Sequence, residues 1–336
     1  MKKLFALALS AAMTLSLAAC GSTGASSSAA PAASSGASAA EPFKIGLLQY
    51  GQHGSLDNCR EGFLQGLEEA GLKEGVDYTV DYQNAGFDDA MDTQIAGKFS
   101  SDGVDMMVAV ATPSAVACYA AAEEKDIPVV YVAVSDPAAA GLDSGNITGT
   151  SDALPVDAQL QLIRAMQPDA KTIGILYTTS EPNSVSTIAE YQAKAGEYGF
   201  TIDAVGVTAQ SEVTQGADTL ISHGVDCFSN LTDNNVVGVL PSILEKTNEA
   251  GIPVYGSEIE QVKLGCAASA GIDYVQLGRQ TGAMAAKVIR GEAACADIPY
   301  ETIDAYSTYL NSDVLDAMGI SVPAEIAANA VEANAA

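Results

Sequence analysis

Residues 224–235 read Gly-Val-Asp-Cys-Phe-Ser-Asn-Leu-Thr-Asp-Asn-Asn, a short apolar run that ends in a polar cluster. Residues 103–115 follow the same order, with Gly-Val-Asp, an apolar run, then Thr and small residues. Short apolar runs bounded by turn residues are typical of buried strands. The two stretches therefore predict two copies of one strand-then-helix unit, with their strand ends facing each other across a ligand.

Two further pairs of segments support this duplication. The strand pattern at 43–48 recurs at 171–177, and the Ile-Pro-Val of 127–129 recurs at 252–254. The three pairs are separated by 128, 125 and 121 positions, and such near-constant spacing is typical of an internal repeat. Because the strands alternate with helical segments, we predict an α/β fold of two doubly wound, Rossmann-like lobes with parallel sheets. Ligands bind such sheets beyond the carboxyl ends of the strands.

The last two predicted elements remain after two equal lobes are counted. They are a helix over 275–290 and a strand over 301–310, and if one joins each lobe the chain crosses between lobes several times. Gly278 and Gly282 in that helix are expected to permit close helix packing rather than to bind phosphate. We expect lobe 1 to comprise residues 43–147 and 272–300, and lobe 2 to comprise residues 148–271 and 301–336.

The first residues are not expected to fold with the lobes. Two lysines precede an apolar run, residues 4–17, which is too short to cross a bilayer as a helix, and small residues then lead to Cys20. This order resembles a bacterial lipobox; an ordinary signal peptide with a chance cysteine is the alternative. We expect a signal peptide at 1–19, then a lipidated Cys20 and a flexible Ser/Ala/Gly tether within residues 20–42.

The composition excludes several classes of function. A formal net charge of −27 argues against nucleic acid and phosphate-rich partners. With two histidines and no C-x-x-C motif, we expect neither a metal nor a cofactor. No nucleophile–base motif appears, so an enzyme on this fold is disfavoured. Five cysteines follow Cys20, and Cys227, inside an apolar run, is expected to be a small buried residue.

A resemblance to one known family is carried by several segments in order, at residues 127–137, 146–149, 180–184, 232–234, 271–274, 277–282, 309–311 and 319–323. The chain is similar to ABC-transporter substrate-binding proteins for tryptophan and tyrosine uptake, which have the type I periplasmic-binding-protein fold. The resemblance implies solute capture outside the cell and delivery to an ABC permease, and we expect a monomer that contacts the membrane only through its lipid.

Charged and hydroxyl side chains at the strand ends are candidates for holding an amino acid. Thr112 and Ser114 begin a helix, where hydroxyls and free N–H groups suit a carboxylate, although either residue can simply cap that helix. Asp233 and Asp273 follow apolar strands and are candidate partners for an ammonium group. Asp136 lies at an equivalent strand end, but it precedes a proline and a turn role is the alternative.

Amides and aromatic rings complete the predicted site. Asn183 and Asn234 can bind the polar head of a ligand or cap helices. Gln49 and Tyr50 follow the first strand, where a ring can stack on an aromatic ligand, and His53 in the same loop is a further candidate contact. The predicted mouth is also flanked by Tyr177, Tyr255 and Tyr274, although each tyrosine can simply be a packing residue. The predicted ligand-binding residues are Gln49, Tyr50, Thr112, Ser114, Asp136, Asn183, Ser184, Thr232, Asp233, Asn234 and Asp273.

These features predict a tethered receptor that binds a free amino acid, aromatic for preference, between two lobes. The first alternative keeps the role and changes the ligand to a branched amino acid, a nucleoside or a sugar. The second is a ligand receptor for a signalling partner. The third, an enzyme on the same fold, lacks a nucleophile–base set.

Overall fold

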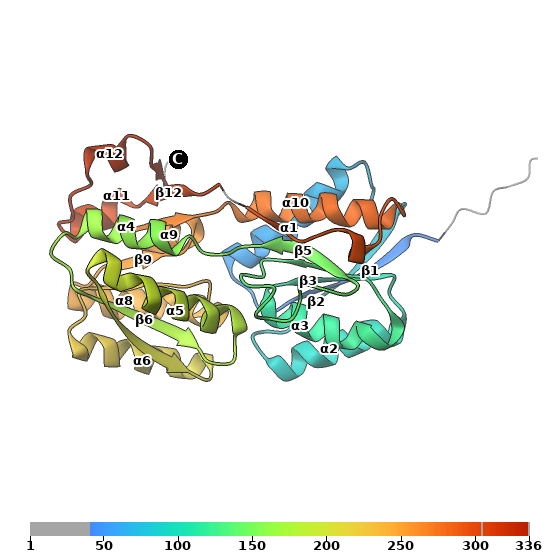
Figure 1. Ribbon diagram of the computed structural model, residues 1–336, viewed down its shortest axis with the longest axis horizontal. Helices are drawn as coiled ribbons and strands as arrows, with labels where there is room; N and C mark the ends of the chain where they lie inside the picture. Colours follow the sequence, from blue (N-terminus) through green and yellow to red (C-terminus); the bar gives the residue numbers. More distant parts are fainter. Residues whose placement is uncertain (1–40, 304, 335–336) are drawn as a thin grey trace, which may run out of the picture. The chain divides into compact units, whose positions relative to one another are not determined.

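The structure is a computed structural model that describes residues 41–303 and 305–334. The predicted signal peptide and the lipidation site at Cys20 lie outside the described residues. Within the described part, two sheets each carry helices on both faces (Figure 1). No helix in residues 41–303 or 305–334 is both long and apolar enough to cross a membrane.

The first sheet, with its helices, forms lobe 1. All its strand pairs are parallel, in the order β11-β5-β4-β3-β1-β2. Its central strands are apolar and fully buried, because helices cover both faces. The strands are β1 (Phe43–Gln49), β2 (Tyr78–Asn84), β3 (Met106–Val110), β4 (Val129–Val132), β5 (Ile147–Ser151) and β11 (Glu301–Thr302); the helices are α1 (Gly54–Glu69), α2 (Asp89–Asp102), α3 (Thr112–Ala122) and α10 (Tyr274–Ile289).

The second sheet forms lobe 2 and has the order β13-β12-β10-β9-β8-β6-β7. Its strands are parallel except that β12 runs antiparallel to β10. The strands are β6 (Thr172–Thr178), β7 (Thr201–Val207), β8 (Cys227–Ser229), β9 (Val254–Gly256), β10 (Ala268–Gly271), β12 (Ser307–Leu310) and β13 (Val331–Glu332). The helices are α4 (Val156–Met166), α5 (Pro182–Lys194), α6 (Gln210–His223), α7 (Asn234–Gly238), α8 (Leu240–Ala250), α9 (Ile259–Leu264), α11 (Ser312–Ala317) and α12 (Ala324–Ala327).

The predicted duplication and fold class are confirmed by the strand orders. In each lobe the second strand is at one edge, and the first, third, fourth and fifth follow it in the same sequence. Cys227 is fully buried within β8, as expected. The five cysteines from Cys59 to Cys295 are buried, and none is bonded to another within the described residues.

The predicted lobe boundaries need correction. β5 (Ile147–Ser151) pairs with β4, and β11 (Glu301–Thr302) pairs with β5, so both belong to lobe 1. The chain thus leaves lobe 1 after Ser151 rather than after residue 147, and again after Thr302 rather than after residue 300. The sequence of β5 contains no apolar run, so its residue pattern does not predict a strand. Its Gly149 is required because a Cβ there would lie 2.0 Å from the Tyr131 carbonyl oxygen.

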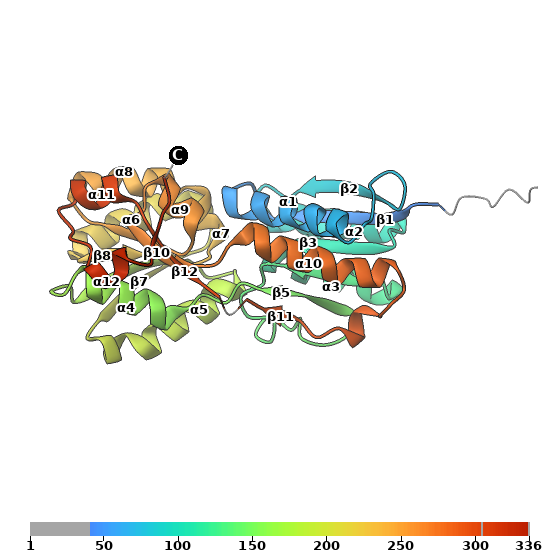
Figure 2. The same ribbon diagram turned by 90° about the horizontal axis from the view of Figure 1, so that it is seen from above.

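Glycines let α1 and α10 pack backbone against backbone in lobe 1 (Figures 1 and 2). A Cβ on Gly278 would lie 2.3 Å from the Cys59 carbonyl oxygen, and one on Gly282 would lie 2.3 Å from that of Phe63. The packing role predicted for these two glycines is therefore confirmed. Gly62 on α1 is equally close to α10, so the contact is built from small residues on both helices.

We expect Gly278→Ala to lower the free energy of unfolding by about 1–3 kcal/mol, because the added methyl group forces two helix backbones apart. Urea denaturation of the two proteins measures the difference. The control is Gly97→Ala in α2, where an added Cβ meets no atom within 4 Å. That change should raise stability by up to about 1 kcal/mol, since alanine favours a helix. Equal effects at both positions would contradict the close-packing account.

Candidate functional site

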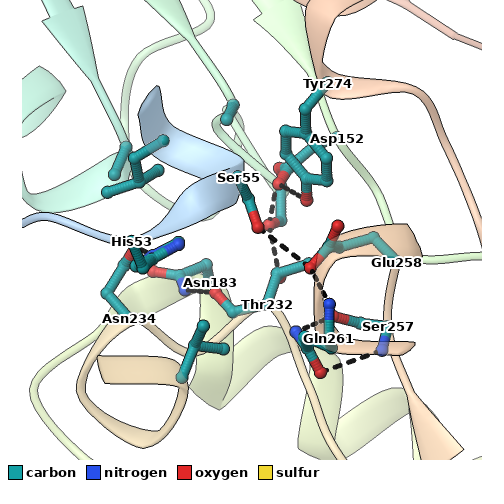
Figure 3. A pocket seen from close by; sticks show the side chains of 15 residues that line it. His53, Ser55, Asp152, Asn183, Thr232, Asn234, Ser257, Glu258, Gln261 and Tyr274 are labelled. Carbon is teal, nitrogen blue, oxygen red and sulfur yellow. Dashed lines mark hydrogen bonds between the residues drawn. The ribbon is translucent and has the colours of Figure 1, made fainter. Parts of the chain in front are cut away.

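A cavity lies between the lobes at the carboxyl ends of their strands (Figure 3). His53 follows β1, Asp152 follows β5, Thr232 follows β8 and Glu258 follows β9, so both sheets contribute. This is where doubly wound sheets bind ligands. The cavity is lined by His53, Ser55, Leu56, Ala111, Ala133, Ser135, Asp152, Asn183, Thr232, Asn234, Val237, Ser257, Glu258, Gln261 and Tyr274.

The lobes meet closely around this cavity. Its enclosed space is about 20 Å³, close to the room that a single water molecule needs. A molecule the size of an amino acid therefore enters only when the lobes separate. Three hydrogen bonds join the lobes at the cavity: Ser55 to Glu258 (2.9 Å), His53 to Asn234 (3.4 Å) and Ser135 to Thr232 (3.1 Å).

Two further hydrogen bonds join the lobes outside the cavity lining. Asn58 Nδ2 donates to Glu260 Oε1 at 3.0 Å, and Ser186 Oγ donates to Asp136 Oδ2. Both pairs are half-buried. They stabilise the closed arrangement of the lobes without contacting the cavity.

Two buried acids give one side of the cavity its charge. Glu258, 1% exposed, accepts hydrogen bonds from Ser55 Oγ and from the backbone N–H groups of Glu260 and Gln261. Burial raises the pKa of the Glu258 carboxyl to about 7. No lysine or arginine is among the described residues that line the cavity. Buried carboxylates without a cation favour a ligand that brings a positive charge.

Asp152 is the second acid and lies where the chain leaves lobe 1. It accepts hydrogen bonds from Ser135 Oγ (2.8 Å) and the Tyr274 hydroxyl (2.7 Å). Burial raises the pKa of its carboxyl, and these two hydrogen bonds act in the opposite direction. Asp152 and Glu258 lie on the same side of the cavity in Figure 3.

The opposite side is organised by a third buried acid, Glu181, which does not line the cavity. Its carboxylate accepts five hydrogen bonds: from the side-chain amide of Asn183, and from the backbone N–H and side-chain amide of both Asn234 and Asn235. Burial raises the pKa of Glu181, and the nearby charge of Asp233 raises it further. The network turns the NH₂ groups of Asn183 and Asn234 towards Glu181, which leaves their oxygens for other partners.

The helices that begin at the cavity differ in how they are capped. Asp233 caps α7, Glu258 caps α9 and Asp273 caps α10. In the described residues no side chain caps α1, α3 or α5, whose N-terminal residues line the cavity or adjoin it. Uncapped N–H groups at a helix N-terminus attract anions.

Strained backbone accompanies the uncapped ends. Ala111, which precedes α3, has φ of 85°, and Ala133, after β4, has φ of 64°. Both residues line the cavity. Non-glycine residues in this conformation cost free energy and cluster at binding sites, because the surrounding structure holds the backbone in place for a ligand.

The structure brings three of the predicted residues to the cavity: Asn183, Thr232 and Asn234. Two predicted acids instead serve the fold. Asp233 is fully buried and accepts four hydrogen bonds, from the backbone and hydroxyl of Thr178, from Ser184 and from the Val236 N–H. Asp273 is exposed and caps α10. Ser184 is held by Asp233 and does not line the cavity.

The predicted ligand-binding residues of lobe 1 lie around the cavity but do not line it. Gln49 donates to the Gly51 carbonyl oxygen, and the Tyr50 hydroxyl donates to Asp89. Ser114 donates to the buried Asp92, which ties α3 to α2. Thr112 follows Ala111 and keeps a buried hydroxyl with no hydrogen-bond partner in the described chain, and Asp136 lies in the outer contact to lobe 2.

Sequence reasoning missed most polar residues of the lining. Asp152 and Glu258 follow β5 and β9, so the rule that selected Asp233, a polar side chain after a strand, also applies to them. Asp152 is absent from the predicted ligand-binding residues because the sequence does not predict β5 as a strand. His53, in the loop after β1, is a candidate ligand contact from its position but is not among the predicted ligand-binding residues. The remaining missed residues are Ser55, Ser135, Ser257 and Gln261, and Tyr274, which the sequence places at the mouth, does line the cavity.

A two-lobed α/β fold with a cavity at the facing strand ends is the architecture of solute-binding proteins of the type I periplasmic class. A family model for ABC transporter substrate-binding proteins matches residues 44–334, and the chain belongs to that family. The resemblance found in the sequence is confirmed. Members of this family are binding proteins rather than enzymes.

Three similar proteins bear on the site. A tyrosine-binding protein of Clostridioides difficile (strain R20291) is 38% identical over 280 residues, which cover 82% of this chain and 80% of that protein. An ABC domain from Streptococcus pneumonia in complex with L-Trp is 32% identical with a TM-score of 0.83, covering 87% of this chain and 99% of that one. A ligand-free, open substrate-binding protein with adhesive properties from Clostridium difficile is 38% identical with a TM-score of 0.64, covering 86% and 99%.

The two structural similarities differ in an informative way. The L-Trp complex has the lower identity but the higher TM-score. The lobes here are therefore arranged more like those of the L-Trp complex than like those of the open structure. This agrees with the small cavity and with the hydrogen bonds that join the lobes.

The buried carboxyl of Asp92 should make the free energy of unfolding depend on pH. Burial raises the pKa of its carboxyl from 3.8 to about 7, so between these values the folded protein holds a proton that the unfolded chain has lost. The free energy of unfolding should thus fall as the pH rises from 4 to 7.5. In Asp92→Asn this contribution is absent, and the wild type should lose about 2–4 kcal/mol relative to the variant over that range.

Urea denaturation at several pH values measures the effect. The control is Ser114→Ala, which removes the hydrogen bond but keeps the titrating carboxyl, so its dependence on pH should remain. The account fails if Asp92→Asn shows the same change with pH as the wild type.

Proposed function

We propose that the protein binds a free aromatic amino acid, tyrosine or tryptophan, between its lobes and delivers it to the permease of an ABC importer. The supporting observation is the polarity of the cavity. Asp152 and Glu258 offer carboxylates on one side, and the N-termini of α1 and α3 are not capped by side chains of the described chain. A zwitterion suits both features, with its ammonium at the acids and its carboxylate at the helix N-termini.

The aromatic side chain is supported by the relatives. One is named a tyrosine-binding protein, and another was solved in complex with L-Trp. A branched amino acid would offer the same head group. Sugars and nucleosides carry no cation for the two buried acids, and so they fit this polarity less well.

The proposal places the protein outside the cytoplasm as a monomer held to the membrane by a lipid on Cys20. The basic start, the short apolar run and the small residues before Cys20 support lipidation. The Ser/Ala/Gly tether then gives the lobes room to reach a permease. A receptor for a signalling kinase would use the same anchor, and neighbouring permease and ATPase genes would favour transport.

Calorimetry with purified protein tests the ligand. L-tyrosine or L-tryptophan should bind, whereas tyramine, which lacks the carboxylate, and 3-(4-hydroxyphenyl)propanoate, which lacks the ammonium, should each bind about 10- to 100-fold more weakly, because each loses charged hydrogen bonds. L-leucine, uridine and glucose are the comparison set. Binding of uridine or glucose with no binding of any amino acid would refute the proposal.

Cell fractionation tests the anchor. In the native host, the wild-type protein should sediment with membranes, and Cys20→Ala should appear in the soluble extracytoplasmic fraction or remain as unprocessed precursor. Ser22→Ala, two residues into the tether, is the control and should stay with the membranes. A wild-type protein that is recovered entirely in the soluble fraction would contradict lipidation.

A further inference from the structure

We propose that His53 selects ligands whose side chain carries a hydrogen-bond donor, so that the site prefers tyrosine and tryptophan over phenylalanine. This inference rests on the proposed amino-acid function and goes beyond it by naming the residue that distinguishes one aromatic side chain from another. It depends on which nitrogen of the His53 ring carries the proton.

The hydrogen-bond network fixes that proton. Asn234 Nδ2 donates to Glu181 at 2.7 Å, and the Asn234 backbone N–H donates to the same carboxylate at 3.1 Å. A reversed amide would place its oxygen against the carboxylate, so Oδ1 of Asn234 is the atom that faces His53 Nε2, at 3.4 Å. Because an amide oxygen only accepts, Nε2 carries the hydrogen and Nδ1 keeps a lone pair.

The imidazole is also neutral and held in place. Burial lowers its pKa to about 4, so at pH 7 no second proton occupies Nδ1. The Phe87 ring lies parallel to it, with an interplanar angle of 5° and ring centroids 6.3 Å apart, and Tyr50 packs edge-on against Phe87. His53 therefore presents an acceptor in a fixed direction.

Two buried acceptors on this side of the cavity lack a partner. Among the described residues, neither His53 Nδ1 nor Asn183 Oδ1 has a hydrogen-bond partner, and both residues line the cavity. Asn183 uses its NH₂ group for Glu181 and for the Thr232 carbonyl oxygen. Figure 3 shows His53, Asn183 and Asn234 gathered together. Buried acceptors of this kind need a donor, and a bound ligand can supply it.

The two serine hydroxyls that lobe 1 contributes to the cavity lining already donate to carboxylates. Ser55 donates to Glu258, and Ser135 donates to Asp152. A ligand ammonium would go to the two acids on the other side of the cavity, because a charged pair is stronger than a bond to a neutral acceptor. The donor for His53 must then come from the ligand's side chain. A phenol O–H or an indole N–H provides one, and a phenyl ring does not.

Calorimetry on the wild-type protein compares L-tyrosine, L-tryptophan, L-phenylalanine and 4-fluoro-L-phenylalanine. The two ligands with donors should bind about 10- to 100-fold more tightly than the two without, because a buried acceptor left unpaired is costly. His53→Phe keeps a ring to stack on Phe87 but removes the acceptor, so the tyrosine-to-phenylalanine ratio should fall to within about threefold of one. Thermal unfolding checks that the variant folds.

Glu258→Gln is the matched control, since it acts on the head group. It should weaken all four amino acids alike and keep the tyrosine-to-phenylalanine ratio. If wild-type protein binds phenylalanine as tightly as tyrosine, the role of His53 is refuted while the amino-acid function stands. If none of the four binds, both proposals fall. The comparison of ligands on the wild-type protein can refute the role of His53 even if His53→Phe does not fold.

Discussion

The buried carboxylate of Glu181, which has no cation beside it in the described structure, is the constraint on which the lobe 2 side of the site depends. It sits at the start of α5 and accepts five hydrogen bonds from asparagine groups. These bonds hold the start of α7 against the start of α5 and turn the amides of Asn183 and Asn234 in one direction. The direction of the Asn234 amide then determines the proton position on His53, across the cleft. A side chain outside the cavity thus sets the hydrogen-bonding character of one of its walls.

The two copies of the duplicated unit have diverged in how the helix after the third strand begins, whereas α1 and its counterpart α5 both start without a side-chain cap in the described chain. In lobe 2, Asp233 and Glu258 cap α7 and α9, so the N–H groups there are already satisfied. In lobe 1, α1 and α3 start without a side-chain cap in the described chain. Since an uncapped helix start attracts anions and a buried acid attracts cations, the same fold offers opposite partners on its two sides. Asp152, at the end of β5, adds an acid from lobe 1, because the crossing point brings it to the acidic side.

The sequence predicted the architecture well because repeats and strand–helix alternation are properties of long stretches. It predicted single site residues less well. A polar residue after a strand can cap the next helix or face the cleft, and the pattern is the same in both cases. Asp233 and Asp273 are N-cap residues of helices, whereas Asn183 and Asn234 line the cavity. The difference arises from neighbours distant in the chain: Thr178 and Ser184 bind Asp233, and no sequence pattern shows that they will meet it. The boundary at β5 was misplaced for a related reason, since backbone pairing with β4 defines that strand.

Closure and recognition are parts of one equilibrium in this arrangement. With the lobes together, Ser55 bonds Glu258 and Ser135 bonds Thr232, and the remaining space is about 20 Å³. A bound ligand has to replace these hydrogen bonds between the lobes. It therefore gains affinity only if its own groups form stronger interactions with the same side chains than those side chains form with each other. The outer pairs, Asn58 with Glu260 and Ser186 with Asp136, favour closure whichever ligand is present. Discrimination between ligands must therefore come from the cavity walls, where buried acids and unpaired neutral acceptors penalise any molecule that cannot donate to them.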